Sequence, residues 1–251
     1  EETFYSTYYK KKNIPNLLFQ NIIEIYTDSK ISVKINNCIS ERKLVNNGVR
    51  QGCPLSPTLF NIYINEIILK WNQIYTSGIK ITSALTLNTL LYADDQVIIS
   101  NSEDNLQRGL YTLNEILKDF GMEISAQKSK VMAFLGQDPV RSKIIHNNQC
   151  LEQVQNFNYL GCEISYQNEK DVNKKITKFT QILGIINNTL KAKLVQKSTR
   201  IKIYNTLALP SLLYGSEIWT LKKNDMKRIK ATEMKFFRRT AGYTLFRPKK
   251  E

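Results

Sequence analysis

The sequence predicts an α+β fold that is followed by a separate helical module. Helix-like and strand-like segments in the first two thirds do not alternate as they do in parallel βαβ folds. The last third contains only helical patterns, over about residues 171–190, 198–215 and 224–240. The charge balance changes at the same place, so we expect a boundary near residues 167–171.

The first part of the chain begins with a helix and a pair of strands. Pro15 stands near the first turn of a predicted helix over residues 17–26. Apolar and polar residues alternate over residues 31–35, which is typical of a half-buried strand. Residues 41–46 follow a turn signal and are predicted to be the returning strand.

A helix, a hairpin and a second helix are predicted next. Ser56 suits an N-cap with Pro57 at the first helical position. Two apolar arms within residues 86–100 predict a hairpin. Apolar residues repeat at helical spacing over residues 102–120. Short strand candidates follow at residues 130–135 and 158–164.

The positive charge is concentrated at the C-terminal end. Residues 1–170 contain 17 Lys and Arg and 17 Asp and Glu, whereas residues 171–251 contain 19 and 5. The whole net charge of +14 therefore lies in the last third. This asymmetry favours a polyanionic partner held against one side of the molecule, and the alternative is a solvated face that serves solubility.

The predicted C-terminal helices are amphipathic. Their apolar residues are expected to pack inward, among them Ile182, Leu183, Ile185, Ile186, Leu207, Leu212 and Leu213. Their cations are then left to solvent, among them Lys174, Lys175, Lys178, Lys191, Lys193, Lys222, Lys223, Arg238 and Arg239.

Several classes of protein are not supported by the composition. No run approaches the roughly 18 apolar residues of a membrane helix, and no signal peptide is visible. The four cysteines form no Cys-x-x-Cys pair, which favours a reducing, intracellular setting. His146 and Cys150 are too few ligands for a zinc site, so we expect His146 to be an ordinary loop residue.

Asp94 and Asp95 are the strongest candidates for chemistry. They lie at the tip of the predicted hairpin, between two apolar arms. Adjacent carboxylates resist joint ionisation unless a cation compensates. Carboxylate oxygens are the ligands that Mg²⁺ prefers, and paired ions about 3.5–4 Å apart catalyse phosphoryl transfer. The alternative is a polar turn, in which aspartate is common.

A loop rich in glycine and proline precedes this hairpin. Its sequence is GVRQGCPLSP, residues 48–57. The glycines allow close approach of the backbone to a ligand, and Arg50 is suited to phosphate. The helix start at Ser56 offers backbone N–H groups to the same kind of ligand. Glycine and proline also simply form loops, which is the alternative here.

Five motifs in order resemble those of reverse transcriptases. They are GVRQGCPLSP with LFN (residues 48–57 and 59–61), YADD (92–95), GMEIS with KSK (121–125 and 128–130), YLGC (159–162) and YGSEIW (214–219). The resemblance covers nearly the whole chain and is to non-LTR, LINE-type retrotransposons. Group II intron maturases share two of these motifs, but Cys53 and the pair Phe60-Asn61 depart from their pattern.

This resemblance implies a fold and an activity. The fold is a truncated right-hand polymerase palm with a ferredoxin-like antiparallel sheet over residues 1–167, then an all-α basic thumb over residues 168–251. The activity is RNA-directed DNA polymerisation in the nucleus. Its partners are an RNA template, a DNA primer and deoxynucleoside triphosphates, and its cofactor is Mg²⁺, with Mn²⁺ as an alternative.

The resemblance also implies roles for individual residues. Asp94 would be a metal ligand, Asp95 its weaker companion, and Lys128 a proton donor near the triphosphate. Residues that face the nucleotide, template or primer end are Tyr92, Arg50, Gln51, Gly52, Pro54 and Ser56. The primer backbone would be held by Tyr159, Leu160, Gly161 and Cys162. Lys128 could also be a solvated surface lysine, and residues 159–162 an ordinary strand and turn.

One departure from the family pattern affects the activity. The first catalytic aspartate of the family is expected roughly 17 residues before Ile14 and Pro15, just off this N-terminus. Glu1 and Glu2 lack the flanking apolar strand and are not assigned that role. Fingers, endonuclease and zinc knuckle are also absent from these residues, so we expect the chain alone to be inactive. The alternatives are a decayed or domesticated nucleic-acid-binding remnant without catalysis, and a maturase.

Overall fold

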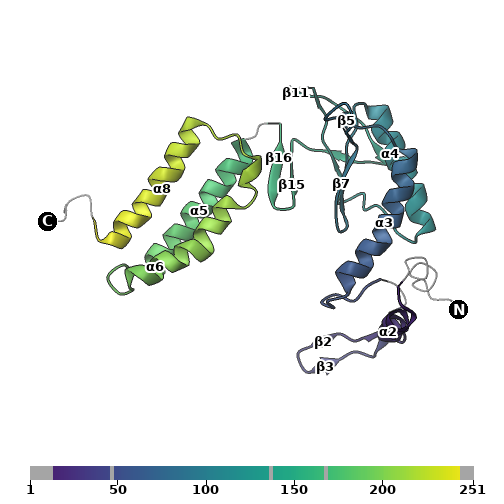
Figure 1. The fold of residues 1–251 in the computed structure, drawn as a ribbon, viewed down its shortest axis with the longest axis horizontal. Coiled ribbons are helices and arrows are strands. Elements are labelled where there is room, and N and C mark those ends of the chain that lie inside the picture. Colours follow the sequence, from purple (N-terminus) through teal and green to yellow (C-terminus); the bar gives the residue numbers. More distant parts are fainter. Residues whose placement is uncertain (1–13, 46–47, 136–137, 167–168, 244–251) are drawn as a thin grey trace. The chain divides into compact units, whose positions relative to one another are not determined.

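The computed structural model describes residues 14–45, 48–135, 138–166 and 169–243 (Figure 1). The chain forms two compact units, an N-terminal unit of residues 1–124 and a C-terminal unit of residues 125–251. The predicted boundary between residues 167 and 168 falls outside the described residues and stays a prediction.

The N-terminal unit contains three helices and four short hairpin pairings in its described residues. The helices are α2 (Asn16–Tyr26), α3 (Ser56–Ile74) and α4 (Glu103–Asp119). The strands are β1 (Lys30–Ile31), β2 (Lys34–Ile35), β3 (Cys38–Ile39), β4 (Lys43–Leu44), β5 (Ile79–Lys80), β6 (Thr86–Leu87), β7 (Thr89–Tyr92) and β8 (Asp95–Ile98). The antiparallel pairs are β1–β4, β2–β3, β5–β6 and β7–β8.

The helices and hairpins agree with the sequence predictions in place, but the half-buried strand predicted over residues 31–35 is wrong: Ile31, Val33 and Ile35 are exposed, and β1 and β2 are separate two-residue strands. One helix start also differs from its prediction. The side chain of Ser102 accepts a hydrogen bond from the backbone N–H of Asn105 and so caps α4. Ser56, by contrast, is the first residue of α3, and Leu55 holds the N-cap position. Ser56 does not cap because its hydroxyl group donates to the carbonyl oxygen of Arg50 at 2.5 Å.

The core of the N-terminal unit lies between α3 and α4. Trp71 and Tyr75 stack at 4.5 Å between ring centroids, and the indole N–H of Trp71 donates to the carbonyl oxygen of Gly109 at 2.9 Å. A Cβ atom at Gly109 would stand 2.6 Å from the ring of Tyr75, so only glycine permits this approach of the helices. Leu91 and Ile98 of the β7–β8 hairpin pack against this core. The hairpin therefore rests on a rigid base.

The C-terminal unit contains short strands followed by helices (Figure 1). The strands are β9 (Lys130–Val131), β10 (Phe134–Leu135), β11 (Asp138–Pro139), β12 (Ile145–His146), β13 (Gln149–Cys150), β14 (Glu152–Gln153), β15 (Asn156–Tyr159) and β16 (Cys162–Ser165). The helices are α5 (Glu169–Thr189), α6 (Lys197–Ile203), the π-helical turn η2 (Tyr204–Ala208), α7 (Leu209–Leu213), the 3-10 turn η3 (Ser216–Ile218) and α8 (Lys223–Ala241). β9 and β14 pair in parallel, and the other pairs are antiparallel.

The second predicted C-terminal helix is present but divided. The backbone N–H of Leu209 bonds to the carbonyl oxygen of Tyr204, five residues earlier, in the turn η2. Pro210 follows directly, and proline lacks an N–H group and its ring crowds the carbonyl of residue i−4. A widened π turn accommodates that defect without ending the helix. The other two predicted helices correspond to α5 and α8.

Some predicted positions of side chains are wrong. His146 lies on β12 and is 4% exposed, rather than in a loop. Lys175 is 6% exposed, although it was expected to face solvent. Ile185, Leu207 and Leu213 are exposed, although they were expected in the core. Helical periodicity identifies two faces of a helix but not which neighbours cover them, and here the neighbouring helices cover only part of the apolar face.

The mixed α+β composition is confirmed, but the ferredoxin-like sheet is not formed within residues 14–45, 48–135, 138–166 and 169–243. Each sheet there has two strands. The β7–β8 hairpin packs one side on the α3–α4 core and pairs with no third strand in this part of the chain. A palm sheet would require further strands beside this hairpin.

Candidate functional site

The tip of the β7–β8 hairpin carries the two adjacent carboxylates. Tyr92 pairs with Asp95, so Ala93 and Asp94 form the turn between the strands. Asp94 and Asp95 are exposed. Ala93 has φ of 52°, a left-handed conformation that costs an L-residue roughly 1–2 kcal/mol. The packed arms of the hairpin outweigh this cost and hold the carboxylates at a defined position.

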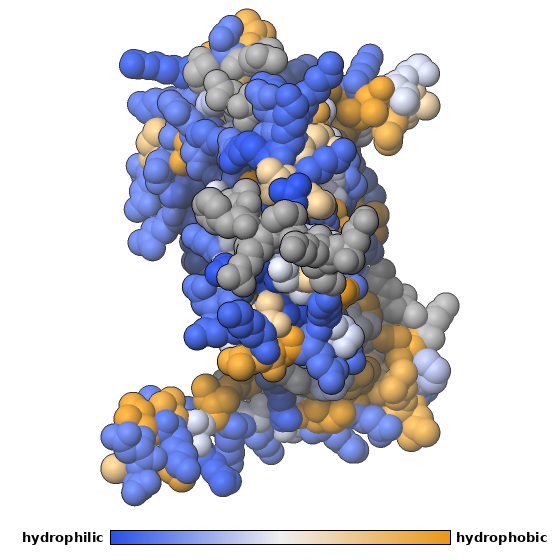
Figure 2. All heavy atoms as spheres, turned by 90° about the vertical axis from the view of Figure 1, so that its left-hand side faces the viewer, coloured by the Kyte–Doolittle hydropathy of each residue, from blue (hydrophilic) through white to orange (hydrophobic). Residues whose placement is uncertain are grey.

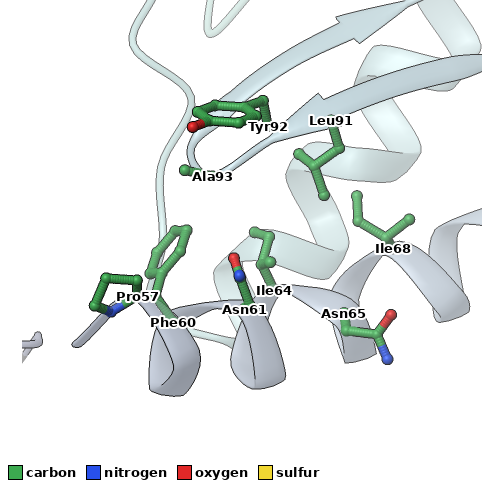
Figure 3. A pocket seen from close by; sticks show the side chains of 9 residues that line it. All are labelled: Pro57, Phe60, Asn61, Ile64, Asn65, Ile68, Leu91, Tyr92 and Ala93. Carbon is green, nitrogen blue, oxygen red and sulfur yellow. The ribbon is translucent and has the colours of Figure 1, made fainter. Parts of the chain in front are cut away.

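A cavity lies between this tip and helix α3. Its volume is about 410 Å³. The lining residues are Pro57, Phe60, Asn61, Ile64, Asn65, Ile68, Leu91, Tyr92 and Ala93 (Figure 3). Figure 3 shows Tyr92 and Ala93 across the cavity from the side chains of α3. The mostly apolar cavity could accept a flat organic group. A negatively charged part of that group would need a cation between it and the two carboxylates at the hairpin tip.

The loop before α3 is anchored by Arg50. The guanidinium group donates to the hydroxyl oxygen of Ser29 from Nε at 3.1 Å and from Nη2 at 2.5 Å. It also lies 5.5 Å from the ring centroid of Tyr26. The hydroxyl groups of Tyr26 and Ser56 are 3.1 Å apart. Arg50 and Ser56 therefore connect the loop to the end of α2, a structural role that the motif did not predict.

The other predicted loop residues face outward. Gln51, Gly52 and Pro54 are exposed, and Gly52 has φ of 85°. No atom lies within 4 Å of a Cβ built on Gly52. Glycine is needed there for its backbone conformation, and its position leaves open space in which a ligand could approach the backbone.

The start of α3 stabilises negative charge. The backbone N–H of Leu55 is the main cause that holds the pKa of the Cys53 thiol below its ordinary value. Hydrogen bonds from Tyr26 and Ser56 act in the same direction, and burial opposes them. Groups that favour a thiolate also favour a phosphate oxygen, as expected at the N-terminus of a helix.

The predicted primer-holding residues form a second hairpin, β15–β16, in the C-terminal unit. Tyr159 pairs with Cys162, and Leu160 and Gly161 make the turn with φ of 50° and 77°. Leu160 is half-buried and Gly161 is exposed. Lys128 also belongs to the C-terminal unit, in the segment after α4, and is exposed.

A buried ion pair next to this hairpin was missed by the sequence analysis. Lys175 and Asp171 of α5 are separated by 3.3 Å, and their side chains are 8% and 5% exposed. Asp171 accepts hydrogen bonds from the backbone N–H of Glu163 at 2.9 Å and from the indole of Trp219 at 2.7 Å. The i,i+4 spacing of an acid and a base was the available signal, but such pairs usually lie on solvated faces.

The oxygen atoms of the carboxylate pair suit a divalent metal, but the pair supplies too few ligands to hold one. Asp94 and Asp95 offer the hard oxygen ligands that Mg²⁺ prefers. Among the residues that the structure describes, no group of three or more His, Cys, Asp and Glu side chains could hold a metal ion. Asp94 and Asp95 by themselves therefore do not make a complete metal site.

The described residues contain no helix of the length and apolarity that a membrane span needs. Hydrophilic side chains cover most of the face that Figure 2 shows.

Comparison with known proteins gives a consistent picture. An uncharacterized transposon-derived protein of Caenorhabditis elegans is 29% identical over 165 residues, which are 63% of this chain and 58% of that protein. The RNA-directed DNA polymerase from mobile element jockey of Drosophila funebris is 24% identical over 251 residues, 93% of this chain and 26% of that protein. The Pol polyprotein from retrotransposable element R2 of Popillia japonica is 26% identical over 202 residues, which are 77% of this chain and 32% of that protein.

The family match is broader than any single motif. The chain spans between about a quarter and three fifths of the length of these relatives. Residues 5–164, more than half of the chain, match the family described as reverse transcriptase (RNA-dependent DNA polymerase). The jockey and R2 relatives agree with the type that the motifs predict. This chain belongs to the reverse transcriptase family, and within it to the non-LTR retrotransposon type.

Proposed function

We propose that the chain is part of an RNA-directed DNA polymerase that extends a DNA primer on an RNA template. The substrates are deoxynucleoside triphosphates, and the reaction is nucleotidyl transfer to the primer 3′-hydroxyl. Residues 1–167 would be the later part of the palm and residues 168–251 the thumb. The family match and the relatives named as RNA-directed DNA polymerases support this proposal.

The carboxylate pair is the observation that carries the proposal. Asp94 and Asp95 stand at a braced hairpin tip, beside a cavity that Tyr92 and α3 line. Asp94 would bind Mg²⁺, or Mn²⁺ in its place, and Asp95 would assist. A divalent ion held there would supply charge stabilisation for the transferred phosphoryl group. Tyr92 would flank the end of the primer.

The remaining site residues would bind and orient the polynucleotides. Gln51, Gly52 and Pro54 would face the template–nucleotide pair, since they are exposed on a loop that Arg50 anchors. Ser56 is buried and its backbone N–H donates to the carbonyl oxygen of Cys53 at 3.1 Å, so it would support this loop from within rather than contact phosphate. Lys128 would donate a proton to the leaving pyrophosphate, and residues 159–162 would hold the primer backbone.

Localised cleavage by Fe²⁺ tests the carboxylate site without requiring catalysis. Fe²⁺ with ascorbate and peroxide produces hydroxyl radicals that cut the backbone near a bound ion. We expect cuts flanking residues 94 and 95 that excess Mg²⁺ suppresses and that Asp94→Asn removes. Asp104→Asn, an exposed aspartate in the first turn of α4, is the matched control and should keep the cuts. Cuts that persist in Asp94→Asn would exclude the assignment.

Nucleic-acid binding without catalysis is the second candidate. The excess of cations in residues 171–251 favours it, because this charge attracts polynucleotides whether or not the metal site works. The same experiment separates the two candidates. Binding of an RNA–DNA hybrid without metal-dependent cuts at residues 94 and 95 supports the second.

A further inference from the structure

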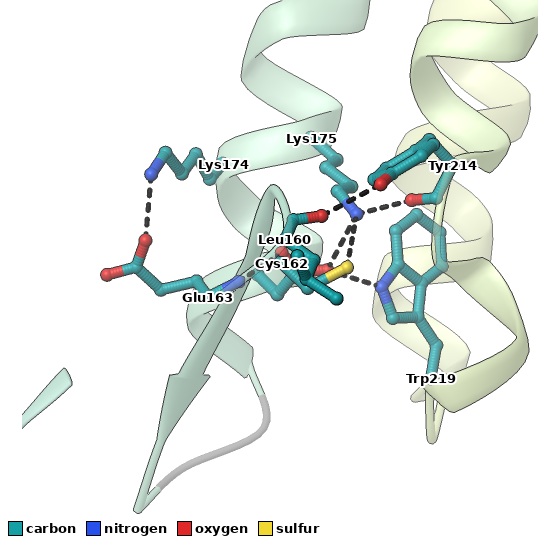
Figure 4. A network of polar contacts seen from close by, with 8 residues as sticks. Leu160, Cys162, Glu163, Lys174, Lys175, Tyr214 and Trp219 are labelled. Carbon is teal, nitrogen blue, oxygen red and sulfur yellow. Dashed lines mark hydrogen bonds and ion pairs between the residues drawn. The ribbon is translucent and has the colours of Figure 1, made fainter. Parts of the chain in front are cut away.

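Lys175 lies at the centre of a buried network that joins three segments of the C-terminal unit. Its amino group donates to the carbonyl oxygen of Tyr214, and it lies 3.5 Å from the sulfur of Cys162. The rings of Tyr214 and Trp219 face it, at 5.2 and 5.8 Å from their centroids. The amino group thus contacts β16 and the segment after α7 at once (Figure 4).

Asp171 connects the same segments through its two oxygens. One oxygen accepts the backbone N–H of Glu163 in β16, and the other accepts the indole N–H of Trp219 after η3. Burial alone would raise the pKa of Asp171, but these hydrogen bonds and Lys175 outweigh it and hold the pKa below its ordinary value. The ionised form of Asp171 is therefore stabilised by two hydrogen bonds and by the ion pair with Lys175.

The turn of the β15–β16 hairpin is held directly by Tyr214. The phenol O–H of Tyr214 donates to the carbonyl oxygen of Leu160 at 2.8 Å. A Cβ atom on Gly161 would stand 3.2 Å from the ring of Tyr214, and one on Gly215 would stand 2.4 Å from the sulfur of Cys162. The two glycines allow the turn and the segment after α7 to approach closely, so the helices set the position of the turn.

A buried ion pair contributes little to the free energy of unfolding by itself. Removing two charges from water costs free energy that their attraction repays only with good geometry and further hydrogen bonds. Apolar side chains of similar volume could fill the same space. What the ion pair adds is a defined orientation of β16, α5 and the segment from Tyr214 to Trp219, because each hydrogen bond has a preferred direction.

Two lysines of α5 contact the strands of the hairpin. Lys174 forms an ion pair with Glu163 at 2.7 Å, and Lys170 donates to the side-chain oxygen of Asn156 at 3.4 Å. The turn itself is open to solvent at Gly161. A turn with exposed backbone is suited to a sugar–phosphate chain rather than to a base edge.

We propose that Asp171, Lys175, Tyr214 and Trp219 are positioning residues that lock the Leu160–Gly161 turn to the thumb helices. The turn and the helices then hold the primer backbone as one body, and the turn does not move independently. This inference rests on the proposed function, because it takes the primer strand of an RNA–DNA hybrid as the ligand.

Two variants of the full chain test the inference. Tyr214→Phe removes only the hydroxyl group that reaches Leu160, and Tyr214 is 59% exposed, so the fold should persist. Asp171→Asn keeps the shape of the side chain but removes its charge. Tyr111→Phe is the matched control, since Tyr111 is 64% exposed and lies in the N-terminal unit.

The measurement is photocrosslinking from 4-thiothymidine near the 3′ end of the primer strand in an RNA–DNA hybrid. Crosslinked peptides are mapped after digestion, and thermal melting is recorded in parallel. We expect the crosslink yield at residues 159–162 to fall about fivefold in Tyr214→Phe, the effect of one lost hydrogen bond. The melting temperature should fall by no more than a few degrees, and the crosslinks elsewhere should stay unchanged. Asp171→Asn should lose the crosslink at the turn more completely, and Tyr111→Phe should match the unaltered chain.

The outcomes separate the inference from the proposed function. If both variants melt as the unaltered chain does and keep its crosslink at the turn, the inference is overturned and the proposed function stands. If Asp171→Asn unfolds, the test depends on Tyr214→Phe alone, and an unchanged crosslink at residues 159–162 in that variant overturns the inference. If the unaltered chain forms no crosslink and does not bind the hybrid, the proposed function fails and the inference fails with it.

Discussion

Arg200 shows how a single charged residue is accommodated inside the protein. It is 0% exposed, and its Nε donates to the hydroxyl group of Thr240 at 3.1 Å. Nη2 donates to the side-chain oxygen of Asn187 at 2.6 Å, and Nη1 donates to the carbonyl oxygen of Leu190. The guanidinium carbon lies 5.2 Å from the ring centroid of Phe236. These contacts satisfy carbonyl groups at the end of α5 and join α5, α6 and α8.

Arg200→Lys is expected to lower the free energy of unfolding by about 3 kcal/mol. Lysine keeps the buried charge but cannot reproduce the planar fork of donors. Urea denaturation followed by circular dichroism measures the loss. Arg239→Lys, at an exposed position on α8, should stay within about 0.5 kcal/mol of the unaltered chain. Similar losses in both variants would contradict the structural role of the fork.

Acid should destabilise the C-terminal unit through Glu163 and Asp171. Hydrogen bonds from Lys174 and Asn156 hold the pKa of Glu163 below its ordinary value, and the pKa of Asp171 is also lowered. A carboxyl group with a lowered folded pKa stabilises the fold above its unfolded pKa of about 4, and this stability is lost as pH falls through the folded pKa.

We therefore predict that the melting temperature falls as the pH is lowered below about 4. Glu163→Gln should make this fall shallower, because the variant has one carboxyl group fewer to protonate. Thermal melts between neutral pH and about pH 3 measure both slopes. A steeper fall in Glu163→Gln, or no difference at all, would show that Glu163 does not contribute.

At the scale of elements, the C-terminal helices bury apolar side chains in a core and leave charged side chains at the surface. Phe179, Leu183 and Phe236 are buried at the centre of this unit. Cations of α8, such as Lys223 and Lys227, face solvent. A thumb that must slide along its substrate cannot read bases, so it should bind phosphates without sequence preference.

Salt dependence should locate this binding on the helices. The binding constant for an RNA–DNA hybrid should fall linearly with salt on logarithmic axes, with a slope of about −0.9 per phosphate contact for B-like duplexes. The triple variant Lys223→Gln, Lys227→Gln and Lys230→Gln should reduce the slope by up to about 3. Fluorescence anisotropy at several salt concentrations gives the slope.

The control for this prediction removes the same charge elsewhere. Lys30, Lys34 and Lys43 are exposed on β1, β2 and β4, in the part of the chain whose net charge is zero. Their replacement by glutamine should leave the slope unchanged. An equal loss in both triple variants would mean that the charge of the C-terminal helices does not determine the binding.

At the scale of the whole molecule, the candidate carboxylate site has too few ligands among the described residues to hold a metal ion. Asp94 and Asp95 are the carboxylates at the hairpin tip, and the part of the chain that the structure describes provides no cluster of three ligands. Two-metal transfer requires ligands that fix both ions, and a misplacement of about 1 Å costs orders of magnitude in rate.

We expect no primer extension by these 251 residues alone. The assay is extension of oligo(dT) on poly(rA) with Mg²⁺ and, separately, with Mn²⁺. Hybrid binding should still be measurable in the same samples, and a cooperative thermal melt shows that the protein is folded. Extension above background that disappears in Asp94→Ala would falsify this prediction.

The features that the sequence determined by itself are local ones. The hairpin with Asp94 at its tip, the cap of α4 at Ser102 and the C-terminal helices depend on neighbours within a few residues. The concentration of charge in residues 171–251 is likewise a property of the chain alone. The order of the motifs was enough to predict the family, because each motif needs particular residues at particular positions.

Only the tertiary structure decided which side chains are covered. Lys175 is buried because β16 and the segment after α7 meet over it, and Ile185 is exposed because none of the described helices covers it. Ser56 bonds to Tyr26 at the end of α2, and Arg50 bonds to Ser29 just after this helix. Burial and partnership depend on segments distant in sequence, and the periodicity of one helix carries no information about which segment packs against it.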